Sequence, residues 1–89
     1  MKFSLGQTTA TPGALSALER SQQTPQRFLD RHISGDWGHV HDDDKQSNED
    51  AVLHGGMIVS AYHTNLYEVI WVITEADRSS TTILLPEEY

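Results

Sequence analysis

The sequence predicts a single α+β domain over residues 11–89, in which three short helices pack on one face of a three-stranded antiparallel sheet joined as a meander. Two Thr-Pro pairs, each followed by apolar residues at helical spacing, predict helices in the first half of the chain. Three runs rich in β-branched residues predict strands in the last third. Because the helices precede the strands, the two kinds of element segregate into separate layers.

The first two helices are predicted from their start signals. Thr11-Pro12 and Thr24-Pro25 each place an N-cap threonine before a proline at the first helical position. Gly35 ends the second helix, since glycine favours the left-handed conformation found after helices. The segment before them, residues 1–10, is short, polar and aperiodic, and we expect it to be a flexible N-terminus.

A third helix is predicted over residues 42–53. Three consecutive acids open it, and carboxylates in a first turn are stabilised by the positive end of the helix dipole. Gly55-Gly56 follows and ends the helix.

Three strands are predicted over residues 57–64, 67–75 and 80–86. The middle run is apolar on both faces, which is typical of a central strand, and its Trp71 is expected in the core. Pro86 ends the third strand because proline cannot donate to the hydrogen-bond ladder.

Composition limits the classes of function. The net charge is −7 and the six Lys and Arg residues are scattered, so we expect no direct nucleic-acid binding. The chain has no cysteine, no signal-peptide pattern and no apolar run long enough to cross a membrane. We therefore expect a cytoplasmic protein with no cofactor and no membrane contact, which binds a protein partner or itself.

The polar segment between the last two strands is the main candidate site. Glu75, Asp77 and Arg78 lie together there and form a candidate binding surface, to which Tyr89 at the C-terminus adds an exposed aromatic anchor. Glu75 and Arg78, joined by His63, are also weak candidates for acid–base catalysis. The alternative is structural: Asp77 and Ser79 shape a turn, and Arg78 pairs with a neighbouring carboxylate.

His39-x-His41 has the residue types of a divalent metal site, because residues two apart in an extended segment point the same way. No further ligand completes a recognised zinc pattern. A helix N-terminus at His41 or Asp42 explains the same run, so we predict no metal site.

Residues 35–38 (GDWG), 59–62 (VSAY) and the string from Trp71 to Tyr89, which contains ITEADRSSTTILLPEEY, resemble a family of short bacterial proteins without an assigned activity. The resemblance covers nearly the whole chain from Thr11 onward. It implies a bacterial cytoplasmic protein that is carried in some cases on plasmids or other mobile DNA.

Over a shorter stretch, the run 71–74 and the following turn resemble small ribonucleases of the barnase and RelE type. These enzymes also place helices before an antiparallel sheet. Three functions therefore stay open. The leading one is a non-enzymatic binding or accessory protein that engages a partner through the Glu75–Thr82 edge and the acidic helix. The alternatives are a ribonuclease-like or toxin-like enzyme and an acidic mimic of nucleic acid.

Overall fold

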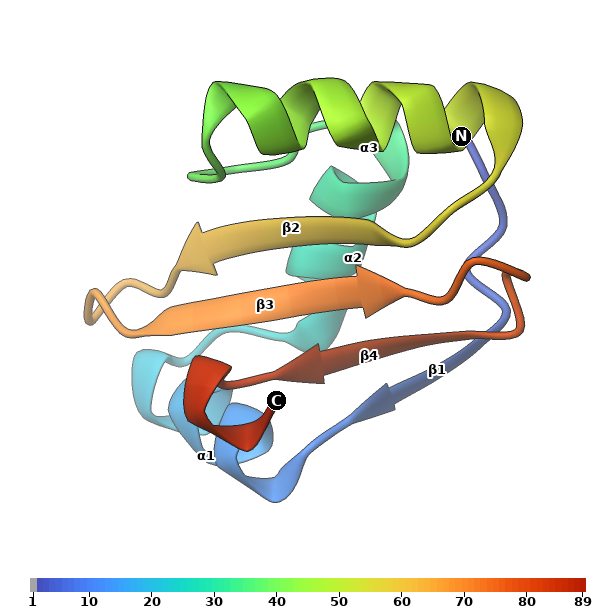
Figure 1. Ribbon diagram of the computed structural model, residues 1–89. Coiled ribbons are helices and arrows are strands. Elements are labelled where there is room, and N and C mark those ends of the chain that lie inside the picture. Colours follow the sequence, from blue (N-terminus) through green and yellow to red (C-terminus); the bar gives the residue numbers. More distant parts are fainter. Residues whose placement is uncertain (1) are drawn as a thin grey trace.

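The computed structural model describes residues 2–89 and contains three α-helices, four β-strands and one short 3₁₀ helix (Figure 1). In chain order the elements are β1 (Gln7–Ala10), α1 (Pro12–Ser21), α2 (Pro25–Ser34), α3 (Asp42–His54), β2 (Ile58–His63), β3 (Val69–Thr74), β4 (Ser80–Leu84) and the 3₁₀ helix η1 (Pro86–Glu88). The predicted α+β class with three helices is confirmed. The three predicted strands form at nearly the predicted positions.

The sheet differs from the prediction in strand number and direction. Its order is β1-β4-β3-β2, with β1 parallel to β4 and the other pairs antiparallel, so it is a four-stranded mixed sheet rather than a three-stranded antiparallel meander. The additional strand occupies residues 7–10, within the segment expected to be flexible. Four mostly polar residues give too short a pattern to predict a strand, and β1 exists because it pairs with β4, 73 residues further along the chain.

The position of β1 changes the nature of the expected partner edge. Gln7 N donates to Ser79 O at 3.0 Å and Thr11 N donates to Ile83 O at 3.0 Å, so β1 covers the side of β4 that would otherwise be open. The stretch 75–82 is therefore not the free sheet edge that the sequence had suggested.

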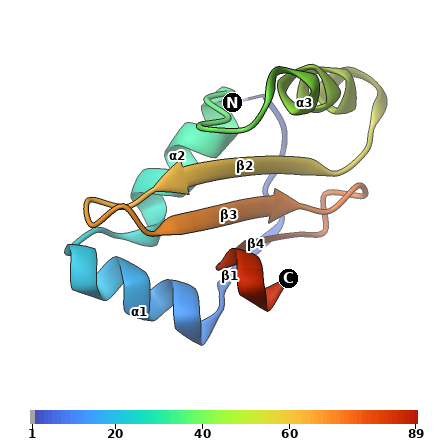
Figure 2. The same cartoon turned by 60° about the vertical axis from the view of Figure 1, so that its left-hand side comes forward.

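Helices α1 and α2 cover one face of the sheet, here called the inner face (Figure 2). Both Thr-Pro start signals are confirmed, and the side chain of Thr11 accepts a hydrogen bond from Ala14 N at 3.2 Å. The core between the helices and the sheet consists of Ala14, Leu18, Phe28, Leu29, Tyr62, Ile70, Val72 and Ile83.

Helix α3 lies along the edge of β2 rather than on the face of the sheet, which corrects the predicted three-helix layer (Figures 1 and 2). The side-chain amide of Asn48 donates to Val59 O at 2.8 Å and accepts from Val59 N at 3.1 Å. The helix buries only Asn48 and Ala51, while Leu53 is 76% exposed. An acidic helix with so narrow an apolar stripe suits an edge better than a core face.

A chain of polar groups crosses the inner face. His32 is fully buried, with Nδ1 2.6 Å from Ser60 Oγ and Nε2 2.9 Å from Thr74 Oγ1. Thr74 Oγ1 lies 2.7 Å from Thr81 Oγ1, and the Thr81 hydroxyl donates to the backbone oxygen of Leu5 at 2.7 Å.

The direction of these hydrogen bonds fixes which ring nitrogen of His32 carries a proton. Because the single proton of Thr81 goes to Leu5 O, Thr81 accepts from Thr74, and Thr74 must accept from His32 Nε2. Nε2 therefore carries a proton, and in the neutral ring Nδ1 accepts from Ser60. Burial lowers the pKa of His32 from 6.5 to about 4, in agreement with a neutral ring.

Candidate functional site

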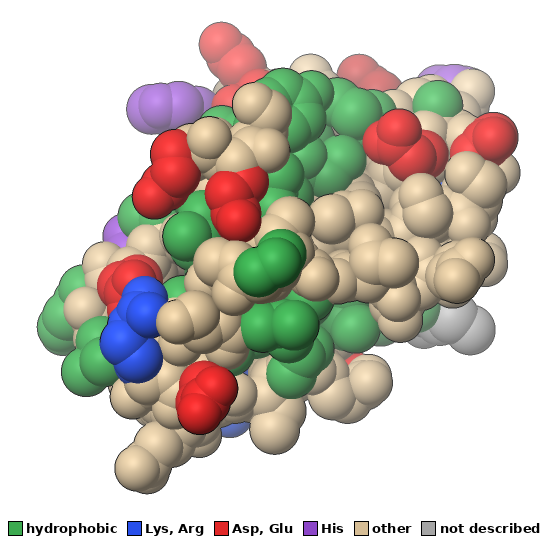
Figure 3. Space-filling view, turned by 90° about the horizontal axis from the view of Figure 1, so that it is seen from below, with side chains coloured by type: hydrophobic (Ala, Val, Ile, Leu, Met, Phe, Trp, Pro, Cys, Tyr) green, Lys and Arg blue, Asp and Glu red, His purple; other side chains and the backbone are tan. Residues whose placement is uncertain are grey.

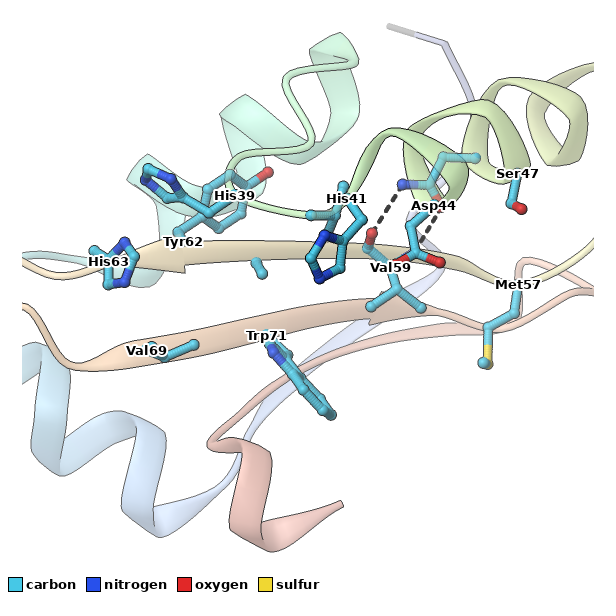
Figure 4. A pocket seen from close by; sticks show the side chains of 13 residues that line it. His39, His41, Asp44, Ser47, Met57, Val59, Tyr62, His63, Val69 and Trp71 are labelled. Carbon is cyan, nitrogen blue, oxygen red and sulfur yellow. Dashed lines mark hydrogen bonds between the residues drawn. The ribbon is translucent and has the colours of Figure 1, made fainter.

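An open pocket of about 600 Å³ lies on the other face of β2 and β3, here called the outer face (Figure 4). The loop before α3 and the first turns of α3 form one wall of this pocket. Its lining residues are His39, Val40, His41, Asp44, Ser47, Asn48, Met57, Val59, Ala61, Tyr62, His63, Val69 and Trp71.

The floor of the pocket is apolar and partly exposed. Successive residues of a strand point to opposite faces. Residues 58, 60 and 62 of β2 therefore enter the inner face, while residues 59, 61 and 63 face outward. In β3, Val69 and Trp71 point to the outer face, and Val69 is 38% exposed.

The loop that forms the wall is held by specific contacts. Gly38 bridges Ala61, and His39 N donates to Ala61 O at 2.7 Å. Gly38 has a φ of +73°, and a Cβ there would lie 2.0 Å from Ala61 O, so the close approach requires glycine.

Asp36 anchors the same loop from the other side. Its carboxylate accepts from Arg31 Nε at 2.7 Å and from Gly38 N at 3.1 Å. The hydrogen bond from Arg31 is the main cause of the lowered pKa of this carboxyl group. The Tyr62 hydroxyl donates to Asp36 O at 2.6 Å, which ties the loop to β2.

Three imidazoles and one carboxylate line the pocket, together with the polar side chains of Ser47 and Asn48 (Figure 4). The rings of His39 and His63 meet edge to face, with centroids 4.4 Å apart, at one end of the pocket. His41 reaches over β2, and Asp44 projects from the first turn of α3. Within residues 2–89 no three His, Asp or Glu side chains come together as a metal-ligand set.

The structure does not bring the three weak catalytic candidates together. His63 pairs with Val69 at one end of the β2–β3 ladder, whereas Glu75 follows Thr74, which pairs with Ile58 at the other end. Five residues of strand separate the two ends, roughly 17 Å. His63 lines the outer-face pocket instead.

Arg78 contacts backbone carbonyls rather than the carboxylate expected from the sequence. Its guanidinium donates to Ala51 O at 2.8 Å and to Gly56 O at 2.6 Å, and also contacts the carbonyls of Glu75 and Ala76 at 3.2 Å. It thereby joins the C-terminus of α3 to the β3–β4 turn, where a cation is also favoured by the helix dipole.

Glu75, Asp77 and Ser79 build that same turn. Arg78 N donates to Glu75 O at 2.9 Å, and Ser79 N donates to the Asp77 carboxylate at 2.9 Å. The contacts with Ser79 lower the pKa of Asp77. Asp77 and Ser79 therefore shape this turn, as the structural alternative predicted.

Tyr89, the predicted aromatic anchor, is 73% exposed and lies edge-on to Trp71 with ring centroids 5.8 Å apart. Trp71 itself is half-buried on the outer face and not in the core, where the sequence had placed it. An indole next to an exposed phenol at the margin of the pocket forms a continuous aromatic surface.

Sequence reasoning missed most of this site. Val59, Ala61, Val69 and Trp71 alternate with core residues. In the middle strand, the apolar character of both faces, including Val69 and Trp71, was interpreted as the mark of a buried central strand. The signal for an open outer face is that β2 and β3 are apolar on both sides, while α1 and α2 supply only enough apolar surface for one side.

Comparisons with known proteins found no matching family, no matching curated protein and no matching solved structure. The resemblance to short bacterial proteins stays a prediction. Within residues 2–89 no helix is both long and apolar enough to cross a membrane.

Proposed function

We propose that this chain is a non-enzymatic binding protein whose outer-face pocket takes up an apolar peptide segment flanked by Lys or Arg. The observation that carries the proposal is the pocket of about 600 Å³ with its apolar floor on β2 and β3. Ligand sites are typically concave, mainly apolar and supplied with a few convergent polar groups, and this pocket has that composition.

The charge of the molecule supports a basic flank on the partner. The net charge is −7, and the acidic start of α3 (Asp42, Asp43 and Asp44) borders the pocket through Asp44. A surface of this sign attracts cationic segments and repels acidic ones. The apolar floor supplies most of the affinity, and the acids supply orientation.

Binding rather than catalysis fits the polar groups of the pocket. A nucleophilic mechanism needs a hydroxyl within hydrogen-bond reach of a base that a third group orients. Among residues 2–89 no hydrogen bond joins Ser47 to one of the three pocket imidazoles. The imidazoles instead offer donors and acceptors for the backbone of a bound segment.

The test is selection of displayed random peptides on the intact protein, followed by affinity measurement of the retained peptides by calorimetry. We expect apolar or aromatic residues next to Lys or Arg in these peptides, and weaker binding at higher salt. Val69→Lys should weaken binding at least about tenfold, since it places a cation on the floor. Leu66→Lys, at a 56% exposed position outside the pocket, is the matched control and should bind like the wild type.

A second pair of variants separates the effect of a charge inside the pocket from the effect of the net charge of the protein. Asp44→Asn, inside the pocket, should weaken binding about threefold, whereas Asp43→Asn, with the same change in net charge, should have a smaller effect. If no peptide is retained, or if retained peptides bind Val69→Lys as well as the wild type, the pocket is not the binding site and the proposal fails.

A further inference from the structure

The two edges of the sheet differ in how far other parts of the protein cover them. The β2 edge is closed, because Gly38 bridges Ala61 and the amide of Asn48 pairs with the backbone of Val59. The opposite edge strand, β1, has a strand neighbour only on the side of β4. A strand edge left in this way presents backbone donors and acceptors to any segment that can pair with it.

The hydrogen-bond register shows which groups face outward. Gln7 and Thr11 direct their N–H groups inward, to Ser79 and Ile83. In a parallel pair alternate residues bond to the neighbouring strand, so the N–H and C=O groups of Thr8 and Ala10 point away from β4.

The β1 edge is short, with four residues, but it lacks the other usual protections of an edge strand. Its sequence, Gln-Thr-Thr-Ala, contains no charged side chain and no proline. In a chain of net charge −7, the 16 residues from Phe3 to Leu18 contain no Asp, Glu, Lys, Arg or His. Viewed from below, the molecule shows a broad area of uncharged side chains, around which lie several acidic groups and a smaller basic one (Figure 3).

A small hollow of about 200 Å³ adjoins this edge. Its lining residues are Thr8, Thr9, Ala10, Pro25, Leu29 and Ile83, none of which is charged. The edge thus combines free backbone groups with an uncharged recess beside them, the two components of strand-addition sites.

We infer that the β1 edge is the contact by which two copies of this chain form a dimer, with their β1 strands antiparallel about a two-fold axis. Two acidic molecules repel each other over most of their surfaces, and this uncharged edge is where two copies approach at the lowest electrostatic cost. A partner of opposite charge would be drawn to the acidic surfaces instead.

The outward groups define one self-consistent register. Thr8 of each copy lies opposite Ala10 of the other, which gives four backbone hydrogen bonds, and Thr9 of one copy faces Thr9 of the other on the axis. The inner-face helices of both copies then cover the same side of one continuous sheet. A chain of only 89 residues has a thin core, and this contact would add stability.

The test is a charge swap at Thr9, read out as molar mass by sedimentation velocity at several protein concentrations. The wild type should show twice the monomer mass of 10.0 kDa. Thr9→Lys alone and Thr9→Glu alone should each associate at least about tenfold more weakly, since like charges face each other directly. An equimolar mixture of the two variants should regain the dimer mass.

Matched controls make the result specific to this edge. Asn65→Lys and Asn65→Glu introduce the same charges at an exposed position in the β2–β3 turn, and both should remain dimeric. Thr8→Pro removes one outward donor without touching the bonds to β4 and should also yield monomers, with circular dichroism reporting that each variant is folded. A wild type that stays monomeric at high concentration, or a dimer that neither charge at Thr9 weakens, overturns the inference.

Discussion

The two faces of the sheet, built from alternate residues of the same strands, are opposite in character. On the inner face, no buried polar side-chain atom of residues 2–89 lacks a hydrogen bond: His32 connects Ser60 to Thr74, and the series of bonds ends at the backbone of Leu5. On the outer face apolar side chains such as Val69 and Trp71 stay partly exposed around an open pocket. Helices α1 and α2 thus complete one face, while the pocket on the other face stays open.

The difference also separates residues that stabilise the fold from residues that line the proposed binding site. Polar groups on the inner face are closed to water and bonded in a fixed direction, so changes there act on folding. Polar groups on the outer face, including His63, are accessible, so changes there should have little effect on folding.

The largest expected effect comes from removing the buried imidazole. His32→Ala should lower the free energy of unfolding by about 4 kcal/mol, because it leaves a cavity and removes the His32 partner of the Ser60 and Thr74 hydroxyls, of which Thr74 keeps its bond to Thr81. His63→Ala removes the same group from the outer face and should change stability by less than about 0.5 kcal/mol. Urea denaturation of both variants is the measurement, and equal losses would contradict the division between the faces.

The next effect is the dependence of stability on pH. The pKa of His32 is about 4 in the folded chain and 6.5 in the unfolded chain. The unfolded state therefore takes up the proton first as pH falls. The stabilisation is complete above about pH 6.5 and is lost as pH falls towards 4, by roughly 3 kcal/mol in total.

The variant His32→Gln isolates this contribution. Glutamine keeps one donor and one acceptor but does not titrate in this range. Denaturation at pH 7 and at pH 4.5 should show a smaller loss in His32→Gln than in the wild type, because carboxylates contribute equally to both. Identical losses would mean that the buried ring is not the source of the acid sensitivity.

The sequence was sufficient for elements with local signals. Thr11 and Thr24 each precede a proline and start α1 and α2, and the acidic run starts α3 at Asp42 as predicted. It was insufficient where a feature depends on distant pairing. β1 requires β4, and the pocket requires α3 to lie beside β2 with Gly38 folded against Ala61.

The same substitution, valine to threonine, can be made on both faces of β3. Val72→Thr buries a hydroxyl among apolar side chains at a fully buried position and should cost about 2 kcal/mol. Val69→Thr adds the same hydroxyl where the side chain is 38% exposed and should stay within about 0.5 kcal/mol of the wild type. Similar costs in chemical denaturation would mean that the outer face is covered in solution.

The smallest effect concerns the margin of the outer face, where η1 holds Tyr89 against Trp71. Glu88 fixes η1, because its carboxylate accepts from the Thr11 hydroxyl at 2.5 Å, Leu85 N at 2.8 Å and Gly13 N at 3.2 Å. These bonds, that of Thr11 first, lower the pKa of Glu88 below 4.5. Glu88→Gln replaces one acceptor oxygen with a donor and removes the charge that favours the start of α1.

We expect Glu88→Gln to lower the melting temperature slightly and to increase acrylamide quenching of the exposed indole, since Tyr89 then covers Trp71 less tightly. Trp37 is only 4% exposed and contributes little to that signal. The difference from the wild type should be full above pH 4.5 and should vanish as pH falls through the lowered pKa of Glu88, because protonation of the wild type removes the same charge. Glu87→Gln, which changes the net charge equally, should leave quenching unchanged. If it increases quenching as much as Glu88→Gln does, the net charge, and not the hydrogen bonds of Glu88, governs the exposure of Trp71.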